Sequence, residues 1–334
     1  MKVLIVDDSQ TNLLLLKHLV ARVEGCEPIA IDSALKAIEW CQENDPDIVL
    51  TDYMMPDMNG LELISYFRNS EKFFEIPVVM VTTADLKEVR QKALELGASD
   101  FITKPVDTTE LLARLRNLLA LRTSQKKLKS RSDQDLILRL SRAAEYRDPE
   151  TGMHIERVIR YSALIAKAIG LSSEEAEHIQ QASPMHDVGK VGILDFILLK
   201  PGPLTPDEFS MMKEHSRLGF EILDGSLSPL VQLAAEIALS HHEKFDGSGY
   251  PRGLSGTAIP VAGRIVAIAD VFDALTSSRP YRGPWPLEKA IDFLKEEKGR
   301  HFDPNYVEAF LSCLNKVLEI RSQFPDPERE IELR

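Results

Sequence analysis

The chain has 334 residues, which corresponds to about two domains at roughly 150 residues per domain. Apolar residues make up 44% of it, enough for a buried core in each domain and too much for a chain that is disordered throughout. The formal net charge of −12 disfavours a dedicated nucleic-acid binder, which would carry a basic face. A small anionic substrate remains compatible with this charge, because a metal cluster can reverse the local field.

Targeting and redox features predict a cytoplasmic protein. The longest segments without Asp, Glu, Lys or Arg are far shorter than the roughly 18 residues of a membrane-spanning helix. The apolar run at the N-terminus is also too short for the core of a signal peptide. Cys26, Cys41 and Cys313 form no Cys-x-x-Cys pair, which fits a reducing compartment and argues against a disulfide framework.

The first part of the chain alternates short β-rich runs with helical patterns. Strands are predicted at residues 2–6, 27–31, 47–51, 77–82 and 100–103. Helices are predicted between and after them at residues 11–23, 33–43, 61–70, 85–96 and 108–121. Five such βα units indicate a doubly wound, flavodoxin-like α/β domain over residues 1–121, with helices on both faces of a parallel sheet.

The composition changes after residue 121. Residues 122–134 are polar and basic, and they fit either a loop or a solvated helix that continues the preceding one. Leucines that keep a rough helical seam, such as Leu121 and Leu128, leave a short coiled coil open. Helical periodicity then predicts an all-α domain over residues 135–324 with Pro- and Gly-rich loops. The tail over residues 325–334 is expected to be frayed.

Carboxylates gather at the predicted ends of the strands. Asp7 and Asp8 follow the first strand and Asp52 ends the third, and the carboxyl ends of parallel strands meet at one edge of a sheet. Oxygen ligands of this kind suit Mg²⁺. Thr82 and Lys104 bring a hydroxyl and an ammonium to the same edge. An aspartate in this setting can attack a phosphoryl donor.

These residues belong to recognisable motifs. Val6-Asp7-Asp8, residues 51–60 (TDYMMPDMNG), Val81-Thr82-Thr83-Ala84 and Thr103-Lys104-Pro105 resemble those of response-regulator receiver domains. The resemblance implies that Asp52 accepts a phosphoryl group from a sensor histidine kinase and that Lys104–Pro105 is a cis bond. It assigns Mg²⁺ binding to Asp7, Asp8 and the Met54 carbonyl, and switching to Thr82, Phe101 and Lys104.

The second half holds a helix with an unusual composition. Residues 264–276 are apolar nearly all round, which marks a buried helix, yet they include Asp270 and Asp273. A buried carboxylate without a partner costs several kcal/mol, so it must be paired or bound to metal.

Histidines supply the economical metal ligands for this half. Five histidines and two acidic residues are the candidates besides Asp270. They are Glu150, His154, His186, Asp187, His215, His241 and His242. This mixed set fits Fe, Mn or Zn and exceeds what one ion needs. Two ions, or three, are therefore expected, with Asp187 bridging them.

The same half, from about residue 141 to 310, resembles the HD-GYP family of cyclic di-GMP phosphodiesterases. Its motifs are residues 147–154 (RDPETGMH), 186–190 (HDVGK), 241–251 (HHEKFDGSGYP) and 269–276 (ADVFDALT). The resemblance implies an all-α HD-superfamily fold and a metal centre with Fe or Mn as the first expectation and Zn as an alternative. It assigns the metal-ligand role to His154, His186, Asp187, His215, His241, His242 and Asp270, with Glu150 as the ligand that permits a third ion.

The resemblance also implies roles in catalysis and substrate binding. Lys190 would neutralise phosphate charge or protonate the leaving oxygen, beside Asp187 as the other catalytic residue. Arginine suits phosphate recognition because its guanidinium binds oxygens in pairs. The expected substrate-binding residues are Lys190, Gly249, Tyr250, Pro251, Asp273, Arg279 and Arg282.

Together these features predict a two-component response regulator. It would hydrolyse cyclic di-GMP to pGpG, with further cleavage to GMP left open, under the control of Asp52 phosphorylation. A non-hydrolytic adaptor that binds a cyclic dinucleotide or a diguanylate cyclase (GGDEF) protein is the alternative. Another cyclic dinucleotide or linear pGpG is the alternative substrate. The sequence leaves open a homodimer and the direction of control.

Overall fold

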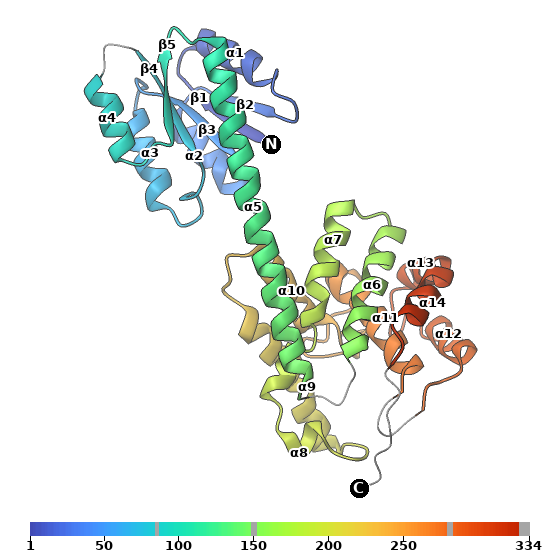
Figure 1. The fold of residues 1–334 in the computed structure, drawn as a ribbon. Coiled ribbons are helices and arrows are strands. Elements are labelled where there is room, and N and C mark those ends of the chain that lie inside the picture. Colours follow the sequence, from blue (N-terminus) through green and yellow to red (C-terminus); the bar gives the residue numbers. More distant parts are fainter. Residues whose placement is uncertain (84–86, 148–151, 279–282, 327–334) are drawn as a thin grey trace. The chain divides into compact units, whose positions relative to one another are not determined.

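The computed structural model describes residues 1–83, 87–147, 152–278 and 283–326. The chain divides into two compact units, Met1–Lys129 and Ser130–Arg334 (Figure 1). The division falls inside the segment 122–134 that was predicted to separate the domains. Within the described residues, no helix combines the length and the apolar character needed to cross a membrane. The three cysteines form no disulfide.

The N-terminal unit is built on a parallel five-stranded sheet with the order β2-β1-β3-β4-β5. The predicted doubly wound α/β fold is confirmed. The strands are β1 (Lys2–Val6), β2 (Glu27–Ile31), β3 (Ile48–Asp52), β4 (Val78–Thr83) and β5 (Asp100–Lys104). The helices between them are α1 (Gln10–Val20), α2 (Ala34–Glu43), α3 (Gly60–Asn69) and α4 (Lys87–Glu95).

Two apolar layers hold the helices against this sheet. Side chains alternate along a strand, so Leu4 and Val6 of β1 pack with α2, α3 and α4 on one face. Val3 and Ile5 pack with α1 and with the first part of α5 on the other face. Both faces are therefore covered, which explains why the central strands read as continuous apolar runs.

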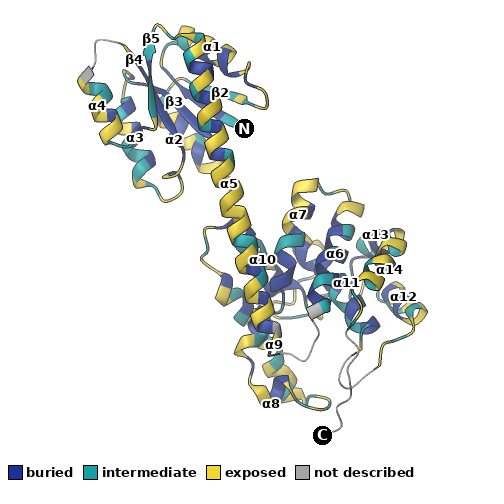
Figure 2. Cartoon of the chain, in the orientation of Figure 1, coloured by how far each residue is buried: buried dark blue, intermediate teal, exposed yellow. Residues whose placement is uncertain are grey.

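Helix α5 (Thr108–Glu145) is one continuous helix and passes through the predicted linker. Of the two alternatives left open for residues 122–134, the helix is correct. Residues 124–132 are exposed along its middle (Figure 2). Leu121 and Leu128 of the proposed seam are 56% and 67% exposed. These two leucines are therefore not buried against the described residues, whereas Leu111 and Leu115, earlier in the same seam, are buried in the core of the N-terminal unit.

The C-terminal unit is helical, as predicted, and its described residues contain isolated bridges but no strands. Helix α11 lies at its centre and is buried along most of its length (Figure 2). It packs against α6, α10, α12 and α13. The elements after α5 are α6 (Gly152–Ala168), α7 (Ser173–Ala182), η1 (Ser183–Met185), η2 (Val188–Gly192), α8 (Asp195–Leu198), α9 (Pro206–Leu223), α10 (Pro229–Ser240), η3 (Gly256–Ala258), α11 (Val261–Thr276), α12 (Leu287–Glu296), α13 (Pro304–Ser312) and α14 (Leu314–Gln323).

The start of the expected frayed tail is held in place. The Asp326 carboxylate accepts a hydrogen bond from Arg157 Nη1 at 2.9 Å and one from the Ser278 backbone N–H at 3.3 Å. These bonds give the buried Arg157 a second anionic partner besides Asp273, and the expected fraying of residues 325–334 remains a prediction. The rest of the tail, residues 327–334, lies outside the described residues.

Candidate metal centre

The predicted ligands of the second half come from five different segments around α11. The segments meet because α6 and α10 pack against α11 and η1, and α9 packs against α10 and η2. His154 lies on α6, His215 on α9 and Asp270 on α11. His186 and Asp187 connect η1 to η2, and His241 and His242 follow α10 directly.

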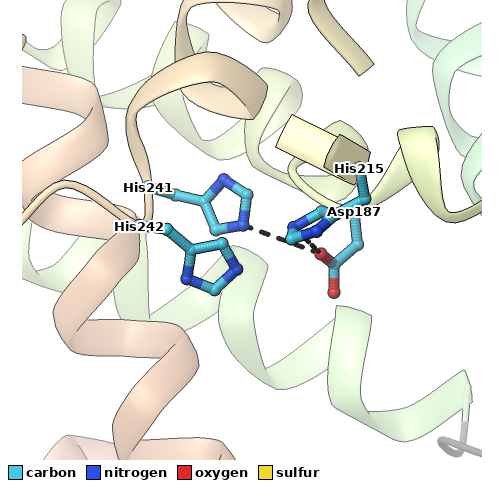
Figure 3. Close-up of side chains that lie close together, drawn as sticks. All are labelled: Asp187, His215, His241 and His242. Carbon is cyan, nitrogen blue, oxygen red and sulfur yellow. Dashed lines mark ion pairs between the residues drawn. The ribbon is translucent and has the colours of Figure 1, made fainter. Parts of the chain in front are cut away.

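These residues form two adjacent groups. Asp187, His215, His241 and His242 each offer one ligand atom, and these atoms lie within 4.8 Å of one another. Figure 3 shows the three imidazoles gathered beside the Asp187 carboxylate. His154, His186 and Asp270 form a second group by the same criterion.

The Asp187 carboxylate connects the two groups. Its Oδ1 lies 3.3 Å from His215 Nε2 and 3.6 Å from His241 Nε2 (Figure 3). Its Oδ2 lies 3.3 Å from His186 Nε2 in the second group and 2.8 Å from Lys190 Nζ. One carboxylate oxygen therefore faces each group, which is the arrangement that a bridging ligand requires.

Backbone carbonyls set the orientation of three imidazoles. The Nδ1 of His186 donates to the Ser183 carbonyl at 2.9 Å, and the Nδ1 of His215 donates to the Met212 carbonyl at 2.7 Å. The Nδ1 of His241 lies 3.1 Å from the carbonyls of both Ile237 and Ala238. Each ring thereby keeps the lone pair of Nε2 for the centre of the cluster.

A carboxylate takes the place of the carbonyl at His154. The Nδ1 of His154 lies 2.8 Å from Asp273 Oδ2, and its Nε2 lies 3.6 Å from Asp270 Oδ1. Asp273 is fully buried, and Arg157 donates to both of its oxygens, at 2.5 Å from Nε and 2.9 Å from Nη2. Asp273 was expected to contact substrate, but in the structure both of its oxygens are engaged by Arg157 and one of them also by His154.

Several buried atoms of the cluster fit a bound cation. His186 Nε2, His241 Nε2 and Asp187 Oδ1 make no hydrogen bond to any described residue. A buried polar atom without a partner costs free energy, so such atoms need another partner. Imidazole nitrogens and carboxylate oxygens in this number and spacing suit divalent ions such as Fe, Mn or Zn. The residues present therefore fit a metal centre.

The charges of the cluster support the same interpretation. Burial opposes ionisation of Asp187, but Lys190 and His186 hold its pKa well below the usual range. Burial lowers the pKa of His241 and, together with His241 and His215, lowers that of His242 strongly. Ionised carboxylate and neutral imidazole are the protonation states that bind metal.

His186 differs from the other imidazoles. Burial would lower its pKa, but Asp187 and Asp270 outweigh burial and raise it. Positive charge is therefore favoured at this position between two carboxylates. A proton can supply that charge, and so can a divalent cation.

A glycine-rich loop, residues 246–253, follows His242 closely in the chain and brings Tyr250 against it. Tyr250 stacks on His242, with ring centroids 4.8 Å apart. At Gly249, a Cβ atom would lie 2.2 Å from the Lys244 backbone nitrogen, so only glycine fits there. Tyr250–Pro251 is a cis bond. The substrate-binding role expected for these three residues remains a prediction.

The sequence interpretation missed two residues that support the site, Glu243 and Arg157. Glu243 is 2% exposed, and its carboxylate accepts the backbone N–H groups of Arg252 and Leu254 at 2.8 and 2.9 Å. It thereby fixes the path of the glycine-rich loop. Arg157 follows His154 by three residues on α6, so the two side chains share one face of the helix. That spacing was the available signal that Arg157 lies near the cluster.

Three of the expected site residues lie outside the described residues. These are Glu150, Arg279 and Arg282. Their assigned roles as the ligand for a third ion and as phosphate-binding residues remain predictions.

The N-terminal unit brings its predicted acidic residues together at the carboxyl ends of β1 and β3. The carboxylates of Asp7, Asp8 and Asp52 have ligand atoms within 4.8 Å of one another. The Lys104 ammonium lies 2.7 Å from Asp52 Oδ1 and 3.1 Å from Asp7 Oδ2. Burial raises the pKa of Asp52, although the hydrogen bond from Lys104 opposes this.

Of the expected switch residues, Thr82 and Lys104 lie at the carboxyl ends of β4 and β5, whereas Phe101 lies three residues before Lys104 on β5. Thr82 is 1% exposed, and its hydroxyl makes no hydrogen bond to a described residue. Phe101 on β5 is half-buried and lies under the Arg90 guanidinium, 5.3 Å from it. Lys104–Pro105 is a cis bond, as expected. The ligand role of the Met54 carbonyl remains a prediction.

Comparisons with known proteins agree with this division. The chain matches the family model of the response regulator receiver domain over residues 3–116 and that of the HD domain over residues 115–306. It is 41% identical to the cyclic di-GMP phosphodiesterase response regulator RpfG of Xanthomonas campestris pv. campestris, over 97% of this chain and 90% of that protein. A cyclic di-GMP phosphodiesterase of Thermotoga maritima is 40% identical over 96% of this chain and 92% of its own length. The 3'3'-cGAMP-specific phosphodiesterase 2 of Vibrio cholerae is 40% identical over 78% of this chain and 47% of its own length.

Proposed function

This chain belongs to the response regulators in which a receiver domain precedes an HD domain, and from that premise we propose that it hydrolyses cyclic di-GMP at the cluster around Asp187. The phosphodiesterase activity is that of the C-terminal unit. The products are pGpG and, after a second cleavage, GMP. Phosphorylation of Asp52 in the N-terminal unit controls the reaction.

The proposal rests on one observation, that the two carboxylate oxygens of Asp187 contact different groups of candidate ligands. One of its oxygens faces His215 and His241, and the other faces His186 beside Asp270. This arrangement supports two ions that share one carboxylate. Two such ions, when bound, polarise a phosphodiester and activate water near neutral pH.

The chain's own residues then hold and orient the substrate. Lys190 lies 2.8 Å from Asp187 and brings an ammonium to the place where phosphate charge accumulates. It neutralises that charge or donates a proton to the leaving oxygen. Tyr250 contacts the nucleotide beside His242, and Arg279 and Arg282 bind phosphate oxygens in pairs.

HD domains bind divalent metal ions, and for this chain we expect Fe or Mn, with Zn as the alternative. The mixed set of histidine nitrogens and carboxylate oxygens accepts all three. The described ligands suffice for two ions, and Glu150 would complete a third site. Elemental analysis of purified protein measures both the identity and the number of the ions.

One experiment tests the activity directly. Metal-loaded protein is incubated with cyclic di-GMP beside the Asp187→Ala variant, and metal content and products are measured on the same samples. We expect turnover by the parent protein, and loss of both metal and turnover in the variant. Equal turnover by the two proteins, or none by the metal-loaded parent, would contradict the proposal.

A second substrate is favoured by one of the comparisons. A 40% identical relative is named as specific for 3'3'-cGAMP. Relative hydrolysis rates of cyclic di-GMP, 3'3'-cGAMP and linear pGpG decide which of them this chain prefers. We expect cyclic di-GMP to be hydrolysed fastest, because the relatives that match nearly the whole chain carry that name.

The N-terminal unit receives the regulatory signal. Asp52 lies beside Lys104 and within 4.8 Å of ligand atoms of Asp7 and Asp8, so Mg²⁺ held by these two carboxylates would neutralise charge during phosphoryl transfer. The phosphodonor is a sensor histidine kinase. Thr82, Phe101 and Lys104 transmit the phosphorylated state, and α5 is the continuous element that leads from this unit into the next.

The alternative of a non-hydrolytic adaptor rests on the loop that follows His242. Ser248 and residues 251–253 are exposed there and offer a surface for a diguanylate cyclase (GGDEF) protein or for a second copy of the chain. Capture of such a partner after metal removal, without any turnover by the loaded protein, would favour the adaptor. Sedimentation measures whether the chain forms a homodimer.

A further inference from the structure

A row of aromatic rings leads from the candidate metal centre to the surface. Tyr250 stacks on His242 at an interplanar angle of 28°. Phe209 on α9 meets Tyr250 edge to face, with centroids 6.4 Å apart and an angle of 84°. Phe209 is 45% exposed, although it is a large apolar side chain with a packing partner. The outer end of the row is therefore open to a ligand.

Lys213 covers the junction between the two outer rings. It follows Phe209 by one helical turn, and its Nζ lies 4.8 Å from the centre of the Phe209 ring and 5.4 Å from that of Tyr250. Within the described residues, it makes no ion pair with a carboxylate, although the chain has a net charge of −12. A cation held over aromatic faces keeps its charge available to an anion.

We propose that Phe209 and Lys213 form a subsite that binds one nucleobase and one phosphate of the cyclic dinucleotide. The proposal rests on the proposed function and names two further residues that bind the same substrate. Phe209 stacks on a base, and the Lys213 ammonium pairs with a phosphate oxygen. An exposed aromatic ring beside an ammonium is the combination by which proteins bind nucleotides without reading their sequence.

The chemistry of stacking predicts which kinetic constants change. Every base offers a π face, so stacking contributes affinity but little discrimination between bases. Loss of the Phe209 ring should raise the KM for cyclic di-GMP and for 3'3'-cGAMP by the same factor, about 5- to 100-fold. The kcat should change little, because neither residue belongs to the cluster around Asp187.

Two variants and two matched controls test this subsite. The variants are Phe209→Ala and Lys213→Met. Phe196→Ala removes another exposed ring, 64% exposed on α8, and Lys289→Met removes a lysine that lies 4.1 Å above the Trp285 ring. We expect a KM increase of about tenfold in each variant and none in the controls. The Lys213→Met variant should also lose part of the salt dependence of KM, because a phosphate contact is screened by salt.

The outcomes separate this proposal from the proposed function. If the parent protein hydrolyses cyclic di-GMP but both variants keep its KM, the subsite is wrong and the activity stands. A loss confined to kcat, or to only one of the two dinucleotides, would likewise overturn the subsite. If the parent shows no turnover, calorimetric titration of the four variants and the parent with cyclic di-GMP replaces KM by Kd. Equal Kd values in all five proteins, or no binding by the parent, would then overturn it.

Discussion

The Nδ1 of His154 lies 2.8 Å from Oδ2 of Asp273, whereas the Nδ1 atoms of His186, His215 and His241 face backbone carbonyls. A carboxylate makes an imidazole a stronger donor to a metal than a neutral carbonyl does. The group formed by His154, His186 and Asp270 therefore has a support that the other group lacks. The two halves of the candidate centre are chemically unequal.

This inequality predicts the effect of Asp273→Asn on metal binding. The hydrogen bond to His154 loses its charge, and metal affinity in that group should fall about 10- to 100-fold. Affinity in the group of His215, His241 and His242 should stay near that of the parent. Competition with a chelator, followed as ions retained per chain, measures the two affinities separately.

A matched variant separates this effect from loss of folding. Asp303→Asn makes the same change in another buried pair, in which Arg264 Nη1 lies 2.6 Å from the Asp303 carboxylate. Breaking either pair costs about 3–5 kcal/mol of unfolding free energy, so both variants should be destabilised to a similar extent. Only Asp273→Asn should change metal affinity. Equal metal binding by the two variants would refute the support role of Asp273.

The regulatory prediction concerns Asp52→Asn. Asparagine keeps the size of the side chain but removes the phosphoryl acceptor, so the variant should lose its response to a small phosphodonor. Basal turnover should remain, because the candidate metal centre lies in a separate compact unit. Turnover with and without the donor measures both effects. Loss of basal turnover in this variant would contradict the separation of the two functions.

The sequence was sufficient to predict those parts of the fold and of the candidate site that follow from periodicity and residue spacing. The alternation of strands and helices predicted the sheet, and the carboxyl ends of parallel strands predicted the contact of Asp7 and Asp52 with Lys104. The apolar helix around Asp270 predicted a buried carboxylate site. Each of these inferences depends on a regular element whose geometry is known in advance.

Other relationships depend on how the elements pack. Asp270 and Asp273 lie on the same buried helix, and periodicity alone does not say that the first faces the cluster and the second faces Arg157. The continuation of α5 depended on whether a polar segment stays helical, which its composition left open. Phe209 and Tyr250 are far apart in the sequence, so no local sequence pattern predicts their contact.

The glycine-rich loop allows a test of close packing. In Gly249→Ala, the added Cβ would lie 2.2 Å from the Lys244 nitrogen, so the backbone beside the candidate metal ligands must shift. We expect a loss of about 1–3 kcal/mol in unfolding free energy, together with weaker cyclic di-GMP binding. Gly202→Ala is the control, because nothing lies within 4 Å of its Cβ position. Equal stability of the two variants would contradict the packing argument.

His301 connects the pH dependence of stability to a single side chain. It stacks on Phe302 with centroids 4.1 Å apart, at an angle of 8°. Burial, followed by the nearby Lys244, lowers its pKa from 6.5 to about 4, and Asp246 and Asp270 only partly oppose this. The folded protein therefore keeps this imidazole neutral at pH values where the unfolded chain is protonated.

The sign of this effect follows from proton binding. Between pH 6.5 and about 4 the unfolded state binds the proton and the folded state does not, so the contribution to stability is complete above pH 6.5 and is lost as the pH falls. The shift corresponds to a loss on the order of 3 kcal/mol across that window. Urea unfolding of the parent and of His301→Gln, measured with a chelator at several pH values, isolates the contribution, because other titrations cancel in the difference. The difference in unfolding free energy between parent and variant should shrink as the pH falls towards 4. A difference that stays constant with pH would show that His301 titrates alike in both states.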